Sequence, residues 1–347
     1  MRRYTSLLLT AFSLFVMVLV GSAYLAGADW AEDTEAMQEV TVYTTLPAEH
    51  AALLANEYEH LYHVKINFVP LAQEDILLRL REQKSSERED AAALLLADRE
   101  TLERAAQEEM LLSYVSQSSD AVPDAFKQQD GYWTGVWYDP TVFCVNKDYL
   151  RTLQQIPDSW MSLAEMNSVR IGITDFVAAD ASSGLLFSMI EQYGDQVTYQ
   201  IWRQIHPKVV QYTKYLNNPV RQAGMGETDI SIAVQSEVLR YLNDGYPLKI
   251  IYPADGTSYL LTGSALTVGA TEQQTALARG LADWLLMDDV QMALQRNNFY
   301  FVPTNPGTLA YKMFAGKNIV LFDHLPKFTK QQKHDFLDRW VKYIRLK

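Results

Sequence analysis

The run from Ala91 to Ala97 consists entirely of apolar residues, and helical patterns lie on both sides of it. A short apolar run of this kind is typical of a strand that is buried on both faces of a parallel sheet. Two further strands are predicted before it, at Val40–Thr44 and Val64–Val69, and a helical pattern follows each of them. This alternation of strands and helices restricts the chain to an open α/β sheet.

A second series of strands and helices follows residue 140. Its predicted strands are 170–174, 229–234 and 248–252, and its predicted helices are 183–193, 196–205, 218–225 and 236–243. The same alternation therefore predicts a second α/β unit rather than an extension of the first.

Two stretches of different composition separate this series from the rest of the chain. Gly131–Pro140 is rich in aromatic residues, and Pro253–Tyr259 is rich in turn-forming residues. Both stretches fit a chain that leaves one lobe, builds a second and returns. We expect one lobe of residues 39–133 plus 256–347, a second of residues 138–252, and a two-segment hinge beneath a cleft between them.

The first 28 residues have the layout of a secretory signal peptide. Arg2 and Arg3 precede an uncharged, mostly apolar stretch that runs from Leu7 to Ala28 and ends in small residues. An uncleaved membrane anchor is the alternative, because a stretch of this length spans a bilayer core of about 30 Å. In either case we expect the rest of the chain to be periplasmic or otherwise extracytoplasmic.

The net charge of −12 argues against nucleic acid as a partner, because an acidic surface repels phosphates. Cys144 is the only cysteine and lies in an apolar run, so we interpret it as a buried hydrophobic residue. His60 and His63 have helical metal-ligand spacing but lie away from the predicted cleft, so no metal site is predicted. No serine–histidine–acid order, carboxylate pair or glycine-rich phosphate loop stands out, and we predict no catalytic residue and no cofactor.

Ligands of open α/β sheets bind beyond the carboxyl ends of the strands, where helices begin. Ser182, Ser183 and Gly184 precede an apolar helix at such a point. Serine is a favoured N-cap, and the backbone N–H groups at a helix start bind anions. These residues therefore either cap the helix or hold an anionic ligand.

Other candidate residues also either cap a helix or bind a ligand. Thr44 and Thr45 end a strand just before a predicted helix, and Asn217 lies just before another. Ser236 and Glu237 open a third helix, where a glutamate interacts favourably with the helix dipole without any ligand. If Glu237 faces the cleft, it favours a ligand that carries an amine.

Several motifs resemble, in order, those of type-2 periplasmic solute-binding proteins that serve ABC importers, in the iron, phosphonate and sugar-phosphate branch (extracellular solute-binding protein family 1-like). They are Val42–Glu49, Gly131–Gly135, Asn146, Pro157–Trp160, Ser182–Gly184, Gly226-Glu227, Asp255–Thr257 and Phe301–Thr304. The resemblance covers most of the chain after the N-terminal segment. It implies a two-lobed α/β fold and a monomeric carrier that binds a small-molecule ligand and delivers it to an ABC transporter permease.

In this family, members that bind ferric iron have two adjacent tyrosines a fixed distance after the Gly-Glu motif. Ser236 and Glu237 stand at that place here, and the nearest tyrosine is Tyr241. The resemblance therefore implies a small organic anion, such as a phosphate ester or phosphonate, rather than iron. A ferric-iron transport protein, a membrane-anchored ligand-sensing receptor and an enzyme on the same scaffold remain as alternatives.

Overall fold

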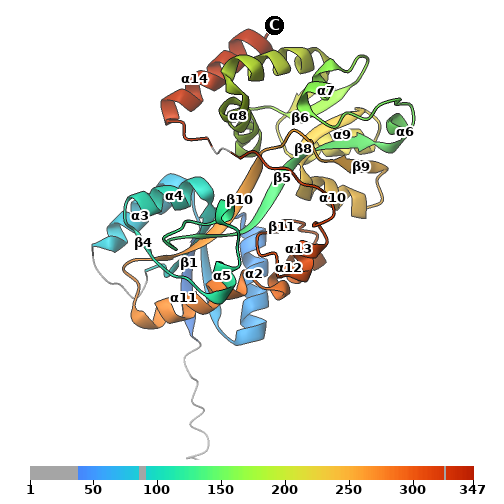
Figure 1. Cartoon of the computed structure of the whole chain (residues 1–347). Coiled ribbons are helices and arrows are strands. Elements are labelled where there is room, and N and C mark those ends of the chain that lie inside the picture. Colours follow the sequence, from blue (N-terminus) through green and yellow to red (C-terminus); the bar gives the residue numbers. More distant parts are fainter. Residues whose placement is uncertain (1–37, 86–90, 324–325) are drawn as a thin grey trace, which may run out of the picture.

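The computed structural model describes residues 38–85, 91–323 and 326–347, and it shows two lobes joined by long strands (Figure 1). The predicted signal peptide or anchor, residues 1–28, lies outside the described residues. Within these ranges, no helix combines the length and apolar character needed to cross a membrane.

The first lobe is built around a hydrophobic core centred on a mixed sheet, with parallel pairs at β1 and antiparallel pairs at β10. Its strands are β1 (Glu39–Thr44), β2 (Lys65–Pro70), β3 (Leu94–Asp98), β4 (Leu111–Leu112), β10 (Tyr259–Thr267) and β11 (Val302–Pro303). Strand β1 lies between β2 and β3 and is parallel to both. The apolar run that begins at Ala91 contains β3, whose residues Leu94–Ala97 are fully buried, as a strand covered on both faces requires.

Helices cover both faces of this sheet (Figure 1). They are α2 (Ala48–Tyr62), α3 (Gln73–Lys84), α4 (Arg99–Gln107), α5 (Gln117–Asp120), η1 (Asp124–Phe126), α11 (Glu272–Trp284), α12 (Asp288–Arg296) and α13 (Leu309–Lys312). Each of α2 and α4 follows the carboxyl end of a parallel strand, so their N-terminal ends lie at the same edge of the sheet.

The second lobe has its own sheet, in the order β5-β8-β6-β7 with β9 also paired to β5. Its strands are β5 (Thr134–Asn146), β6 (Ile171–Thr174), β7 (Val209–Thr213), β8 (Ile230–Val234) and β9 (Leu248–Ile251). Its helices are α6 (Lys147–Leu150), α7 (Trp160–Glu165), α8 (Asp180–Ile205), η2 (His206–Lys208), α9 (Asn217–Gly224), α10 (Gln235–Asn243), α14 (Lys330–Trp340) and the π-helical turn η3 (Val341–Arg345).

Two features of this lobe follow closely from the sequence. Helix α8 is interrupted at Gly194, which has a positive φ of 78°, so the two predicted helices are two halves of one bent element. Cys144 is fully buried in a small apolar cluster with Val142 and Val220, which confirms its interpretation as a hydrophobic residue.

Strand β5 connects the two lobes. Its first half pairs with β10 in the first sheet, and its second half, Thr141–Val145, pairs with β8 in the second. A second segment, which contains Thr257 and Ser258, runs beside β5. The Thr141 N–H donates to Ser258 O at 2.9 Å, and the Thr257 hydroxyl donates to Thr141 O at 2.8 Å. A third segment joins them through Phe322, whose N–H donates to Thr257 O at 2.9 Å. We expected only two connecting segments.

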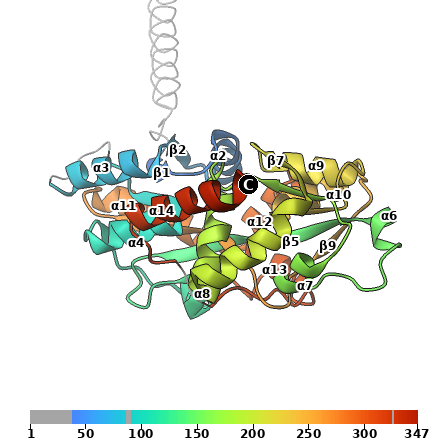
Figure 2. The ribbon, with the colours of Figure 1, turned by 90° about the horizontal axis from the view of Figure 1, so that it is seen from above.

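The C-terminal segment also differs from the expectation. Phe322, Trp340 and Ile344 are buried in the second core, whereas the predicted range 256–347 places them in the first lobe. The amphipathic pattern of this segment predicts an apolar face but does not specify which core receives it. The third connecting segment carries the chain back across the hinge, so α14 packs beside α8 (Figure 2).

Candidate functional site

The carboxyl ends of β1 and β3 bring Thr44, Thr45 and Asp98 together in the first lobe. Thr44 is fully buried, and its hydroxyl donates to Leu96 O at 2.6 Å and accepts from the Leu46 N–H at 3.0 Å. The Thr45 hydroxyl accepts from the Asp98 N–H at 3.0 Å, which leaves its own hydrogen available to a ligand. Of the two predicted threonines, Thr45 is therefore the better placed to donate a hydrogen bond to a ligand.

Helix α8 begins three residues earlier than predicted, at Asp180, and its N-cap is Ala179. Ser182 is therefore not an N-cap, and the capping interpretation of this motif is wrong. The N–H groups of Ser182 and Ser183 both donate to Ala179 O at 3.0 Å, so they are not free for an anion. The first two N–H groups of the helix, at Asp180 and Ala181, have no intrahelical acceptor.

The two serine hydroxyls differ in their environment. The Ser183 hydroxyl donates to Asp180 O at 3.1 Å. Ser182 is buried, and its hydroxyl forms no hydrogen bond with any other described residue. Gly184 has open space where a Cβ atom would lie. Ser182 and the first two N–H groups are thus the groups of this motif that remain free to bind a ligand.

Asn217 is the first residue of α9 and does not cap it, because the N-cap position belongs to Leu216. Its side chain forms no hydrogen bond within the described part of the chain, so it also remains free. The residues just before it, Lys214 and Tyr215, are exposed beyond the carboxyl end of β7. The Lys214 ammonium group lies 5.5 Å from the centre of the Tyr215 ring.

The N-terminal end of α10 is occupied by a side chain of the hinge. Asp139, on β5, is 5% exposed, and its carboxylate accepts from the Ser236 N–H at 2.9 Å and from the Ser236 hydroxyl at 2.6 Å. Burial raises the pKa of Asp139 to about 7, and the bonds from Ser236 oppose this shift. Ser236, a predicted ligand residue, is therefore engaged inside the protein.

Glu237 follows Ser236 and pairs with Arg240 on the same helix at 2.6 Å. Burial raises its pKa, and the positive charge of Arg240 lowers it. This end of the second lobe holds two carboxyl groups, Glu237 and Asp139, and one guanidinium group, Arg240, and Glu237 raises the pKa of Asp139 further by repulsion. This end is unfavourable for an anionic group and favourable for an amine.

A buried tyrosine, Tyr138, and a half-buried one, Tyr252, lie next to this end of the lobe. The Tyr252 hydroxyl donates to Gln235 Oε1 at 2.6 Å, and the ring of Tyr138 stacks on Phe126 with 5.0 Å between centres. Burial raises the pKa of both tyrosines well above the ordinary value. Ferric iron binds phenolate oxygens, so it must displace the phenolic proton, and a raised pKa makes this displacement less favourable.

The residue nearest to the missing tyrosine pair, Tyr241, is turned away from this region. Its ring packs against Tyr246 with 5.1 Å between centres, and it contacts the small cluster around Val142. Among the residues described, no group of three or more His, Cys, Asp or Glu side chains is placed to hold a metal ion.

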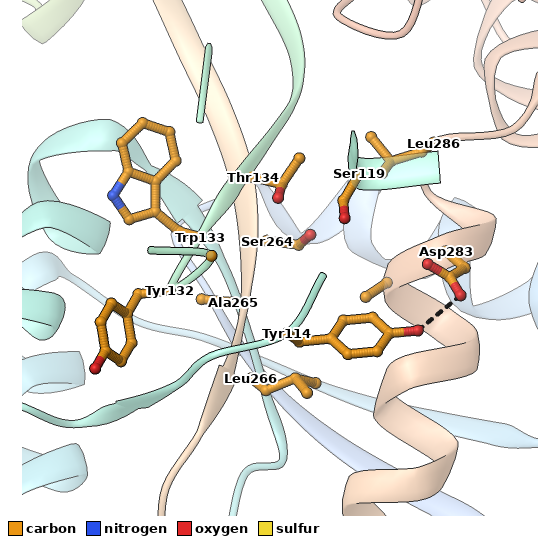
Figure 3. Close-up of a pocket in the computed structure, with 12 residues that line it drawn as sticks. Tyr114, Ser119, Tyr132, Trp133, Thr134, Ser264, Ala265, Leu266, Asp283 and Leu286 are labelled. Atoms are coloured by element: carbon orange, nitrogen blue, oxygen red, sulfur yellow. Dashed lines mark hydrogen bonds between the residues drawn. The ribbon is translucent and has the colours of Figure 1, made fainter. Parts of the chain in front are cut away.

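A cavity of about 20 Å³ lies in the first lobe, away from the residues above (Figure 3). Tyr114 and Asp283 both line it, and the Tyr114 hydroxyl donates to Asp283 Oδ2 at 2.8 Å. A space of this size holds about one water molecule, so it is too small for an organic solute.

The sequence interpretation missed Asp139, Lys214 and Tyr215. Asp139 lies 97 residues before its partner Ser236, so no local pattern links them. Lys214 and Tyr215 directly follow β7, a strand that the sequence interpretation did not predict, so the rule that ligands bind beyond carboxyl ends of strands was not applied there.

The chain is similar to known proteins in both sequence and fold. The family described as "Bacterial extracellular solute-binding protein" matches residues 89–317. An uncharacterized protein of Haemophilus influenzae is 22% identical over 296 residues, which are 82% of this chain and 84% of that protein.

Solved structures of periplasmic binding proteins share the fold. AfuA from Actinobacillus pleuropneumoniae, with exogenous fructose-6-phosphate bound, has a TM-score of 0.65 and 20% identity over 89% of this chain and 99% of its own. The Bordetella ferric binding protein has a TM-score of 0.70 and 20% identity over 87% of this chain and 98% of its own. These similarities establish a type-2, two-lobed periplasmic binding fold.

Proposed function

Because the chain belongs to the bacterial extracellular solute-binding protein family, we propose that it captures a small polar solute between its lobes for an ABC importer. The observation that carries this proposal is the placement of free polar groups at strand ends in both lobes, on either side of the connecting strands. A solute that contacts both lobes favours their closed arrangement, since it binds that arrangement more tightly than the open one.

The lobes we propose differ from the sequence prediction in one respect. The first comprises residues 39–133 plus 256–321, and the second comprises residues 138–252 plus 322–347. The basis for this change is the packing of Phe322 and Trp340 in the second core. The protein acts as an extracytoplasmic monomer, has no catalytic step, and uses an ABC permease as its protein partner.

The ligand we propose is a small organic anion, such as a phosphate ester or a phosphonate. Its anionic group binds at the start of α8, where Ser182 and two backbone N–H groups are free. Lys214 and Asn217 add a positive charge and an amide in the same lobe, and the Thr45 hydroxyl contributes from the first lobe. The sugar phosphate in the AfuA structure is an example of such a ligand.

Glu237 adds a second requirement, because it places a second carboxyl group near Asp139 at the start of α10. We expect the part of the ligand near α10 to be neutral or to carry an amine. Ferric iron has less support despite the similarity to the Bordetella ferric binding protein, since burial raises the pKa of the nearby tyrosines and so opposes loss of the phenolic proton.

Native mass spectrometry of the purified protein, followed by calorimetry with fructose 6-phosphate and inorganic phosphate, tests the proposal. Ser182→Ala removes a free hydroxyl, whereas Ser183→Ala removes one that already bonds within its helix. A hydrogen bond to a charged group is worth about 1.5–3 kcal/mol, so Ser182→Ala is expected to weaken anion binding about 10–150-fold.

Ser183→Ala serves as the matched control and is expected to change affinity by less. Equal effects of the two substitutions contradict the assignment of Ser182. Failure of every anionic solute to bind, with binding of ferric citrate instead, overturns the proposed ligand class.

A further inference from the structure

Helix α14 is firmly packed on the second lobe. Trp340 is fully buried, with ring centres 4.7 Å from Phe176 and 6.0 Å from Trp202. The Tyr199 hydroxyl donates to Phe336 O at 2.8 Å, which fixes the middle of the helix to α8. The apolar face of α14 therefore moves with the second core.

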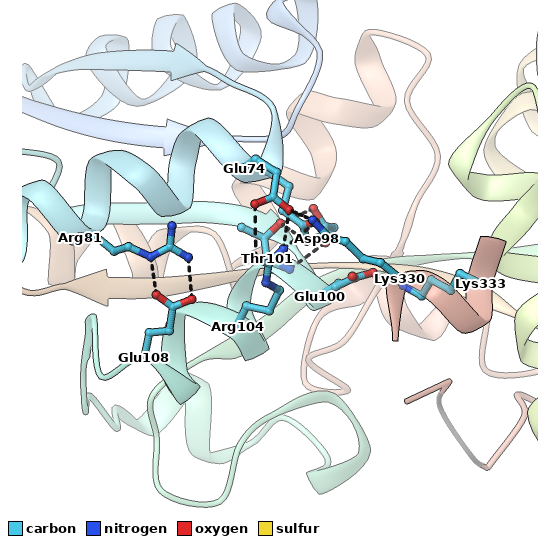
Figure 4. A network of polar contacts seen from close by, with 10 residues as sticks. Glu74, Arg81, Asp98, Glu100, Thr101, Arg104, Glu108, Lys330 and Lys333 are labelled. Carbon is cyan, nitrogen blue, oxygen red and sulfur yellow. Dashed lines mark hydrogen bonds and ion pairs between the residues drawn. The ribbon is translucent and has the colours of Figure 1, made fainter. Parts of the chain in front are cut away.

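The N-terminal turn of the same helix contacts the first lobe. Lys333 forms an ion pair with Glu100 of α4 at 2.6 Å, and Lys330 forms one with Glu74 of α3 (Figure 4). Both α3 and α4 bury leucines in the first core, so these glutamates move with the first lobe. Figure 2 shows α14 extending from beside α8 toward α3 and α4.

Glu74 is held charged by its surroundings. Glu74 also pairs with Arg104 at 2.8 Å, and hydrogen bonds from Arg104 and Lys330 lower its pKa to about 2. Lys333 is steadied from the second lobe as well, since its ammonium group lies 5.8 Å from the ring of Phe187 on α8. The contact thus joins groups that are fixed on their own lobes.

We propose that α14 is an electrostatic clasp that holds the two lobes in their present orientation through Lys330 and Lys333. The clasp lies on helices outside the three connecting segments of the hinge. A rotation about the hinge that separates the lobes must therefore break these ion pairs. The consequence for solute affinity rests on the proposed function, whereas the clasp itself does not.

Dissolved salt provides a direct test of this arrangement. The screening length falls from about 30 Å at 0.01 M salt to about 3 Å at 1 M salt, and exposed ion pairs weaken accordingly. We expect high salt to release the clasp and to widen the distribution of distances between the lobes. Loss of one exposed pair is expected to change the ratio of the two lobe arrangements about 1.5- to 5-fold.

The experiment measures the distance between spin labels at Ala52→Cys and Gln204→Cys in the protein without added solute. Both positions are exposed, one on α2 and one on α8, and the native Cys144 is too buried to react. Lys333→Glu is expected to widen the distance distribution at low salt, and Glu100→Lys in the same chain is expected to restore it.

Lys327→Glu is the control, because Lys327 is exposed and forms no ion pair within the described residues. Distances that stay the same in Lys333→Glu and at high salt overturn the clasp. Since no solute is present, this result is independent of whether the proposed anion binds. A charge swap that fails to restore the original distribution, although the single variant widens it, also contradicts a specific pairing.

Discussion

The carboxylate of Asp139 accepts two hydrogen bonds from Ser236, one from the backbone N–H at 2.9 Å and one from the hydroxyl at 2.6 Å. The N-terminal end of α10, which is an anion-binding element by its geometry, is therefore satisfied by a carboxylate of the protein itself. A ligand's anionic group has no place there. This relationship directs our proposed anion site to α8 and leaves the α10 end to a neutral or cationic group.

We predict that Asp139→Asn changes how the stability depends on pH. Asp139 has a pKa of about 7 in the folded protein and about 3.9 when unfolded. Between these values the folded protein keeps the proton that the unfolded chain has lost, so wild-type stability falls as the pH rises. The asparagine variant lacks this loss. Its free energy of unfolding, compared with that of the wild type, is therefore expected to rise as the pH increases from about 4 to 7.

Urea unfolding curves at several pH values check this prediction. Asp244→Asn is the control, since Asp244 is exposed and its side chain forms no hydrogen bond in the described residues. Stability curves of wild type and Asp139→Asn that run parallel across this pH range show that Asp139 is not a buried, protonated group.

Ferric iron provides a second test of the site. We predict that ferric citrate produces no orange-red absorption band, because Tyr138 and Tyr252 have raised pKa values and Tyr241 is turned away. Visible absorption spectroscopy detects such a band directly. A band that appears with the wild type and disappears in Tyr252→Phe establishes phenolate ligation and contradicts the prediction.

We predict that Lys214→Gln lowers the affinity for fructose 6-phosphate about 1.5- to 5-fold, as expected for an exposed charge interaction. The variant is also expected to show a weaker dependence on salt, because one screened attraction is gone. Calorimetry at two salt concentrations measures both effects. Lys249→Gln is the matched control on the same lobe, since Lys249 is exposed on β9. Identical losses in both variants point to a general effect of net charge.

The fold was largely predictable from the sequence because it depends on periodicity. The apolar run that contains Leu94–Ala97 and the break at Gly194 both leave local signals, and the structure has a buried strand and a helix interruption there. The start of α8 was missed because Ala179 is an unfavourable N-cap residue, while the serines that follow are favourable ones. A local preference was thus outweighed by the packing of the helix.

The candidate site was less predictable because it depends on contacts between distant segments. Thr44 and Thr45 lie at the end of a strand and Ser236 lies at the start of a helix, as the sequence predicts. Which of their polar groups are free depends on partners such as Leu96, Asp98 and Asp139, which are distant in the sequence. The docking of the C-terminal helix was not predicted for the same reason, because it depends on contacts with a distant segment. An amphipathic pattern shows that a face is buried without showing which surface covers it.

This docking leads to our last prediction, that Trp340→Ala destabilises the protein by about 3–5 kcal/mol, the usual cost of truncating a buried tryptophan. Trp340 is fully buried among Phe176 and Trp202, so its removal leaves a cavity in the second core. Guanidinium unfolding followed by circular dichroism measures the loss. Leu346→Ala is the control, because Leu346 is 75% exposed and its truncation is expected to cost less than about 0.5 kcal/mol. Equal stability of the two variants means that the helix is not packed on the second lobe, and it removes the basis for the clasp.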